Sequence, residues 1–202
     1  MPLPYTAVPD AAGMARMLSP IEGSFGYVHG VLTQTTVGEP VEWHYPGPSP
    51  DPYAIVGWNT WRDYTVSARV VLPRTEPASP PPGAALIARF QGFLGTTVSH
   101  FRGYELKVRS DGTWQLTANG PEPVTLASGR VAAAHAYAMS LSTRGTTISA
   151  GINGARVATV INDTYRDGPA GLASLGYYPV QYPSFSVSQP RSYGASSAPG
   201  SG

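Results

Sequence analysis

The fold prediction rests on residues 42–72, EWHYPGPSPDPYAIVGWNTWRDYTVSARVVL. In the last third of this stretch, from Asp63 to Leu72, apolar and polar side chains alternate, which is the pattern of a β-strand with one buried face. A short polar tip that carries two tryptophans precedes this strand, and an apolar run, residues 53–57, precedes the tip. The stretch therefore predicts two strands that flank an aromatic-rich tip, as in a β-hairpin.

Similar short alternating runs continue on both sides of this stretch. Residues 24–36 predict a hairpin around His29 and Gly30, and residues 103–118 predict another around a Ser-Asp-Gly turn. The later runs are separated by Arg-Gly, Asn-Gly or Asp-Gly. Because the chain offers no helical crossover that could connect parallel strands, the sequence predicts an all-β protein, an antiparallel β-sandwich or jelly roll.

The composition agrees with this fold class. Glycine and proline are abundant, with 23 and 21 residues, while charged residues make up only 12% of the chain. Such a balance is typical of a loop-rich β-protein. A length of 202 residues suits one sizeable core. We expect one β-sandwich over residues 1–188, with a solvated proline-rich loop at residues 73–83 and a disordered tail at residues 189–202.

Charge and termini exclude several classes of partner. The formal net charge is +1, and the 13 basic residues, of which Lys107 is the single lysine, are scattered along the chain. This spread predicts no binding to nucleic acid. The N-terminus lacks the features of a signal peptide, and no run reaches membrane-spanning length, so we expect a soluble chain. Cysteine is absent, which excludes disulfides and thiolate chemistry.

Acidic residues that are close in the sequence lack the arrangement that glycoside hydrolysis requires, which is two carboxyl groups roughly 5 to 10 Å apart. Glu39 and Glu42 would face opposite sides of an extended strand. Asp163 and Asp167 flank a tight turn, where aspartate usually caps backbone amides. The four histidines lack metal-ligand spacing. The sequence therefore predicts no catalytic residue and no metal site.

Aromatic residues near tips and strand ends are the remaining functional candidates. Tryptophan rings offer flat apolar faces against which the C–H face of a sugar can pack, while nearby polar groups bond its hydroxyls. The predicted carbohydrate-binding residues are Trp61, Trp58, Asn59, Arg62 and Tyr53, and Tyr177 and Tyr178 also lie near strand ends. In contrast, Trp43 and Trp114 lie inside alternating strands and are expected in the core.

Several longer segments resemble one known family. They are LPYT at 3–6, EGSFGYV at 22–28, PYAIVGWNTWRDYTVSARV at 52–70 and GYELKVRSDGTWQL at 103–116, together with the spacing of Gln34, Pro40 and Trp43. In these segments the chain resembles the C-terminal lectin-like domain of galactocerebrosidase, glycoside hydrolase family 59, over residues 3–187. The resemblance implies a concanavalin A-like, laminin-G-like lectin domain.

The resemblance also implies that catalysis takes place in a different domain from this one. In that family the two catalytic glutamates lie in a separate barrel domain, and the lectin-like domain places a tryptophan-bearing loop over the galactose pocket. Trp61 matches that tryptophan. Trp58 and Asn59 depart from the residue types that the family often has, and would alter the rim of the pocket.

A structural calcium ion is a further property of the family. Its acidic ligands follow the opening PYT segment and lie near the last strand. Those positions hold Ala7, Val8 and Pro183 here, none of which has a carboxylate. The resemblance therefore implies that the calcium site is lost and that the domain uses no cofactor.

The expected function is carbohydrate binding by an accessory domain that is not catalytic by itself. The expected ligand is a galactosyl glycan or a glycolipid headgroup, and the expected protein partner is the catalytic barrel of a glycoside hydrolase. Two alternatives stay open at this point. The chain could be a detached C-terminal part of a galactocerebrosidase whose barrel is encoded separately, or a purely structural or protein-interaction sandwich.

Overall fold

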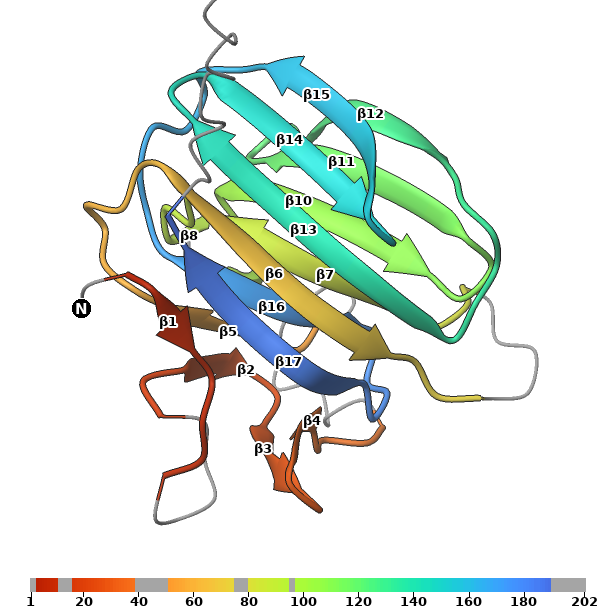
Figure 1. Ribbon diagram of the computed structural model, residues 1–202. Coiled ribbons are helices and arrows are strands. Elements are labelled where there is room, and N and C mark those ends of the chain that lie inside the picture. Colours follow the sequence, from red (N-terminus) through yellow and green to blue (C-terminus); the bar gives the residue numbers. More distant parts are fainter. Residues whose placement is uncertain (1–2, 11–15, 39–50, 75–79, 95–96, 190–202) are drawn as a thin grey trace, which may run out of the picture.

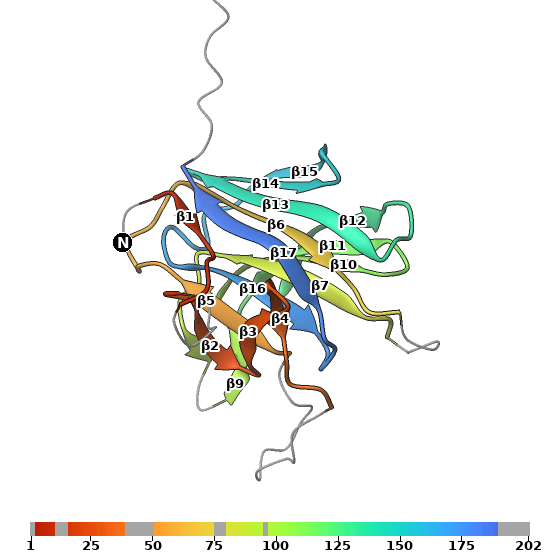
Figure 2. The ribbon, with the colours of Figure 1, turned by 60° about the horizontal axis from the view of Figure 1, so that its bottom comes forward.

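The protein is an all-β sandwich of two antiparallel sheets, as the sequence predicts (Figure 1). The computed structural model describes residues 3–10, 16–38, 51–74, 80–94 and 97–189. In these ranges it contains strands and turns but no helix. Figure 2 shows the two sheets as stacked layers, with the first strands of the chain at one side.

Each sheet joins strands that are distant in the sequence. The eight-stranded sheet has the order β15 (Ala155–Ile161), β14 (Thr147–Ile152), β13 (Ala136–Arg144), β6 (Tyr64–Val71), β17 (Gln181–Ser188), β4 (Val31–Gln34), β3 (Phe25–Val28), and β1 (Tyr5–Thr6) also pairs with β17. The seven-stranded sheet has the order β12 (Val124–Arg130), β11 (Thr113–Asn119), β10 (Gly103–Arg109), β7 (Gly83–Ala88), β16 (Ala170–Leu175), β5 (Tyr53–Val56), β2 (Ser19–Glu22). A small third sheet pairs β8 (Phe93–Leu94) with β9 (Thr97–Phe101).

Both predicted hairpins are confirmed, and their turns explain why. His29 and Gly30 join β3 to β4 with positive φ angles of 51° and 79°, the conformation that a two-residue hairpin turn requires. Gly112 joins β10 to β11 with a φ of 82°. Beside it, the Asp111 carboxylate accepts hydrogen bonds from the Thr113 amide and hydroxyl, and these bonds lower the pKa of Asp111.

The prediction of a hairpin in the stretch 42–72 is wrong. Strand β5 belongs to the seven-stranded sheet and β6 to the eight-stranded sheet, so the tip between them crosses from one layer to the other. A hairpin usually needs a connection of about two to five residues. The longer tip, residues 57–63, can instead span the spacing of roughly 10 Å between packed sheets.

The core lies between the two sheets, and every second side chain along a strand points into it. Along β6 the even-numbered residues from Tyr64 to Val70 are buried, as predicted. Along β10, Tyr104, Leu106 and Val108 face the core. The side chains of Glu105, Lys107 and Arg109 alternate with them and therefore lie on the outer face of the seven-stranded sheet. Trp114 is 8% exposed and belongs to the core, which confirms its prediction.

Some predictions fall on segments outside the described residues. These are Trp43 with the strand expected around it, residues 75–79 of the proline-rich loop, and the tail from residue 190. Within the part of the chain that the structure describes, no helix has the length and apolar character needed to span a membrane.

Candidate functional site

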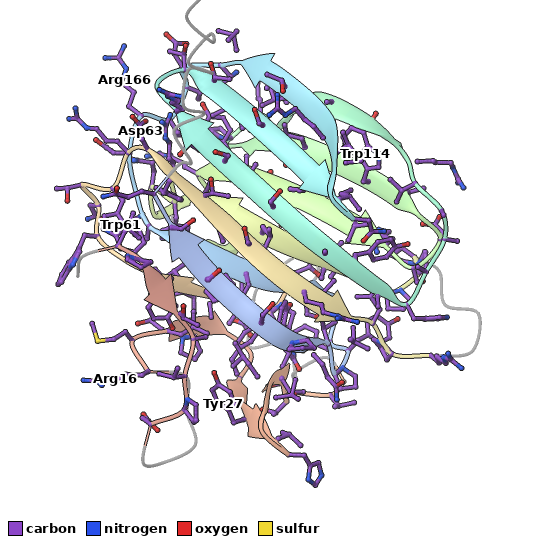
Figure 3. All side chains as sticks on the ribbon, viewed as in Figure 1. Arg16, Tyr27, Trp61, Asp63, Trp114 and Arg166 are labelled. Carbon is purple, nitrogen blue, oxygen red and sulfur yellow. The ribbon has the colours of Figure 1, made fainter. Side chains whose placement is uncertain are left out.

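The tip between β5 and β6 gives its two tryptophans opposite environments. Trp61 is only 9% exposed and packs edge-on against Tyr64, with 5.8 Å between ring centroids. Its ring lies over Gly57, where an added Cβ would be 2.5 Å from the indole. Trp58, in contrast, is 54% exposed. The structure therefore places Trp61 in the core at the end of the sandwich (Figure 3). It presents Trp58 to solvent.

The polar residues predicted at the tip are accessible. Asn59 is exposed, and the Arg62 side chain is 75% exposed, with a long ion pair of 3.9 Å to Asp167. An exposed pair of this length contributes little to stability. The tip thus offers one indole face, one amide and one guanidinium to a ligand or a partner.

A buried arginine holds the tip in place. Arg89, at the end of β7, is 1% exposed, and its guanidinium donates hydrogen bonds to the backbone carbonyl oxygens of Arg62, Tyr165 and Gly145 at 2.8 to 3.1 Å. It also lies 3.5 Å from a carboxylate oxygen of Asp63. One cation therefore connects three loops at this end of the sandwich.

Tyr53 lies in a different part of the molecule from the other predicted site residues. It starts β5, is 3% exposed, and belongs to an apolar cluster on the outer face of the seven-stranded sheet. Its ring packs against Phe101 and Phe90 at centroid distances of 5.6 and 6.2 Å. Tyr177, also buried, donates a hydrogen bond to Glu22 at 3.0 Å.

This outer face carries a polar pocket of about 320 Å³ beside the Tyr53 cluster. That volume is at the lower end of the range of roughly 300–1,000 Å³ that is usual for small-molecule sites. The pocket lies over β5, β10 and β11, and one side is apolar while the other is polar. Its main lining residues are Asp51, Tyr53, Phe101, Glu105, Lys107 and Asn119.

Glu105 forms the polar floor of this pocket. The residue is 4% exposed although it faces away from the core. Its Oε2 atom accepts a hydrogen bond of 2.7 Å from the Asn119 amide and lies 3.0 Å from the Lys107 ammonium. Among the described residues, no donor contacts its Oε1 atom. The carboxylate is thus held rigidly by one oxygen and has the other available.

Charge in the pocket is arranged around Lys107. The carboxylate of Glu105 raises the pKa of Lys107, so this lysine stays charged. Asp51 accepts a hydrogen bond of 2.7 Å from the Gly176 amide. Desolvation by the surrounding pocket walls raises the pKa of Asp51, and the nearby Glu105 adds to this effect. Two carboxylates and one ammonium therefore share the pocket.

The family is shown by the sequence. The family model described as the galactocerebrosidase C-terminal lectin domain matches residues 22–190. The chain belongs to this family. It is accordingly a lectin-like, carbohydrate-binding domain of glycoside hydrolase family 59. A comparison with curated proteins found no match.

Solved structures share the fold of this lectin domain at low identity. The carbohydrate-binding module CBM66 from Bacillus subtilis is 10% identical, with a TM-score of 0.63 over 86% of this chain and 96% of that one. The mannose-bound exoplasmic/lumenal domain of VIP36 is 12% identical, with a TM-score of 0.64 over 91% and 88%. A galectin-like protein of unknown function from Bacillus subtilis is 16% identical, with a TM-score of 0.56 over 85% and 88%.

The positions at which the resemblance implies calcium ligands follow β1 and lie in β17, and they carry no carboxylate here. Strands β1 and β17 pair at this point, and the Ala7 amide donates a hydrogen bond of 3.0 Å to the Phe185 carbonyl oxygen. The implied ligand positions hold Ala7, Val8 and Pro183, whose side chains have no oxygen, whereas calcium prefers carboxylate and carbonyl oxygens. The described residues also contain no group of three or more His, Cys, Asp or Glu side chains that could hold a metal ion.

The polar pocket of the lectin domain was missed by reasoning from the sequence. Asp51 and Glu105 are far apart in the sequence, but the seven-stranded sheet brings both to the lining of one pocket. One signal was present: the alternation of β10 places Glu105 and Lys107 on the face opposite the core. The partner Asn119 depends on the register between β10 and β11, which the sequence does not state.

Proposed function

We propose that this lectin domain binds a galactosyl glycan or a glycolipid headgroup in the polar pocket on the outer face of the seven-stranded sheet. The observation that carries the proposal is Glu105, a buried carboxylate that lines the pocket and has one oxygen fixed by Asn119 and Lys107. Galactose is the expected sugar because the matching family is the C-terminal lectin domain of galactocerebrosidase.

Each wall of the pocket suits one part of a sugar. The open Oε1 atom of Glu105 is placed to accept a hydrogen bond from a hydroxyl group, and Asp51 offers a second carboxylate. The rings of Tyr53 and Phe101 supply an apolar surface for the C–H face. A hydrogen bond to a charged group contributes about 1.5–3 kcal/mol. Two such bonds less the cost of ordering give affinity near millimolar, for which about 4 kcal/mol is needed.

The tip is a second candidate location for sugar contact. In the resemblance Trp61 carries this role, but its burial at 9% leaves Trp58, at 54%, as the indole with an exposed face. Asn59 and Arg62 stand beside Trp58 and could bond hydroxyls. The observation in favour of this location is that the half-exposed indole of Trp58 has two exposed polar side chains, Asn59 and Arg62, beside it in the tip.

A single titration separates the two locations. Galactose and lactose are added to the protein, and binding is followed by NMR chemical shifts. We expect Glu105→Gln, which keeps the shape of the side chain, to weaken binding about tenfold because the charged acceptor is lost. Trp58→Ala is expected to leave the affinity unchanged.

Glu122→Gln serves as the matched control, because Glu122 is exposed and lies outside the main lining of the pocket. Loss of binding with Trp58→Ala but not with Glu105→Gln would move the sugar to the tip. Absence of any saturable signal in the parent protein at tens of millimolar sugar would reject galactoside binding altogether.

We further propose that the protein partner is the catalytic barrel of a glycoside hydrolase. The support is membership of the family together with the accessible Trp58 and Arg62 at the tip, which give one end of the sandwich a contact surface. Reading the gene immediately upstream for a barrel with paired glutamates tests this pairing. A purely structural sandwich predicts no such neighbour.

Calcium is expected to have no effect on this domain. Because Ala7, Val8 and Pro183 supply no carboxylate, an ion added in millimolar excess should not stabilise the folded state. Thermal unfolding in calcium and in EDTA is therefore expected to give the same midpoint. A clear rise of the midpoint in calcium would contradict the proposal and indicate another set of oxygen ligands.

A further inference from the structure

A second hollow of about 490 Å³ lies on the same outer face, next to the polar pocket. Three basic side chains, Lys107, Arg109 and Arg130, contribute to its lining, and no carboxylate does. We call this hollow, with Lys107, Arg109 and Arg130 in its lining, the basic hollow. Since the chain as a whole has a net charge of only +1, three cations in one hollow are a local concentration of charge.

The strand registers explain how the basic hollow forms. Lys107 and Arg109 are two residues apart on β10 and so point to the same side of the sheet. Arg130 on β12 is opposite Thr113 on β11. Gly129, beside Arg130, lies against the Trp114 indole, which fills the space that a side chain at position 129 would need.

The positive charge of the basic hollow is only partly compensated. Arg109 donates a hydrogen bond of 2.6 Å to the Pro81 carbonyl oxygen, and among the described residues no carboxylate pairs with it. Arg130 is 71% exposed and lies 3.8 Å from Asp111, which is itself 39% exposed. Such an exposed ion pair exchanges easily with another anion. Only Lys107 has a close partner, Glu105 at 3.0 Å.

The basic hollow and the polar pocket are adjacent. Lys107 and Gln115 contribute to the lining of both, so a ligand that fills the pocket can extend over β11 without leaving the surface. The charges along this path change from the carboxylates of Asp51 and Glu105 to the guanidinium groups of Arg109 and Arg130. A neutral sugar bonded through its hydroxyls suits the first end, and an anionic group suits the second.

We propose that the lectin domain prefers acidic galactosyl glycans, in which a sulfate or carboxylate substituent binds in the basic hollow while the neutral sugar occupies the polar pocket. The inference rests on the proposed function. Guanidinium groups bind sulfate and carboxylate oxygens through paired N–H donors, and such charge-assisted bonds are stronger than neutral ones. The preference is therefore electrostatic and should weaken with salt.

The test compares lactose, 3′-sulfolactose and 3′-sialyllactose in calorimetric titrations at low and high ionic strength. We expect at least one of the two acidic sugars to bind about tenfold more tightly than lactose at low salt, as expected for one added charge-assisted contact. The double variant Arg109→Gln/Arg130→Gln should lose this advantage and keep the affinity of the parent for lactose. A gain for 3′-sulfolactose alone assigns the hollow to sulfate, and a gain for 3′-sialyllactose alone assigns it to carboxylate.

The control is Arg69→Gln/Arg156→Gln, which removes the same charge from exposed positions on the eight-stranded sheet. This variant should keep the preference. Equal affinity for all three sugars, or equal loss in both double variants, would overturn the inference while leaving neutral galactoside binding intact. If lactose and the acidic sugars all fail to bind the parent protein, the proposed function fails as well.

Discussion

Replacing Arg89 with methionine is expected to lower the free energy of unfolding by about 3–5 kcal/mol. The substitution leaves the carbonyl oxygens of Tyr165 and Gly145 without the guanidinium that they now contact at 2.8 Å. A buried polar group without a partner costs about 1–3 kcal/mol, and methionine fills much of the volume but donates no hydrogen bond. Urea unfolding followed by far-ultraviolet circular dichroism measures the difference.

The matched control is Arg62→Ala in the same tip. Its side chain is 75% exposed, whereas its backbone carbonyl, which accepts bonds from Arg89 and Thr143, is kept. We expect a change within about 0.5 kcal/mol. A loss below about 1 kcal/mol for Arg89→Met would mean that the three loops find other partners and that the buried arginine does not hold the tip.

Local patterns were sufficient to predict the strands that define the sandwich. The alternation from Tyr64 to Val71 depends only on residues within one strand, and the turns at Gly30 and Gly112 require a positive φ that glycine adopts without strain. Each of these features depends only on residues that are neighbours in the sequence. The fold class, two hairpins and the core position of Trp114 could therefore be derived before the structure.

Contacts between distant strands could not be derived in this way. Arg89 ends an apolar strand and reads as an ordinary polar terminus, yet its φ of 52° turns it into the core to meet three loops. The pocket likewise depends on which strands are neighbours, because its lining combines Glu105 of β10, Asn119 of β11 and Asp51, which precedes β5. Sheet order and register are properties of the whole chain, and no short segment contains them.

The structure gives the two tryptophans of the tip different roles. The sequence predicts one site for Trp58 and Trp61 because both precede the same strand, and the resemblance implies the sugar contact for Trp61. Crossing between the two sheets directs Trp61 over Gly57 and into the core, and leaves Trp58 outside. Trp61 is therefore expected to stabilise the domain, and this expectation can be separated from a role in binding.

Replacing Trp61 with alanine is expected to lower the free energy of unfolding by about 3–5 kcal/mol, the usual cost of removing a buried tryptophan side chain. The indole is 9% exposed and contacts Tyr64 and Gly57, so its loss leaves a cavity at the end of the sandwich. Trp58→Ala, at a side chain that is 54% exposed, should change the stability by no more than about 0.5 kcal/mol. Urea unfolding monitored by circular dichroism compares the two without relying on tryptophan emission.

Trp61→Phe is expected to destabilise the domain less than Trp61→Ala, because an aromatic ring still fills part of the site over Gly57. We expect this variant to bind galactose and lactose with the affinity of the parent, since the polar pocket contains neither Gly57 nor Trp61. Unchanged stability in Trp61→Ala together with lost sugar binding in Trp61→Phe would contradict the structural role. That result would indicate that the Trp61 indole contacts galactose, as the family resemblance implies.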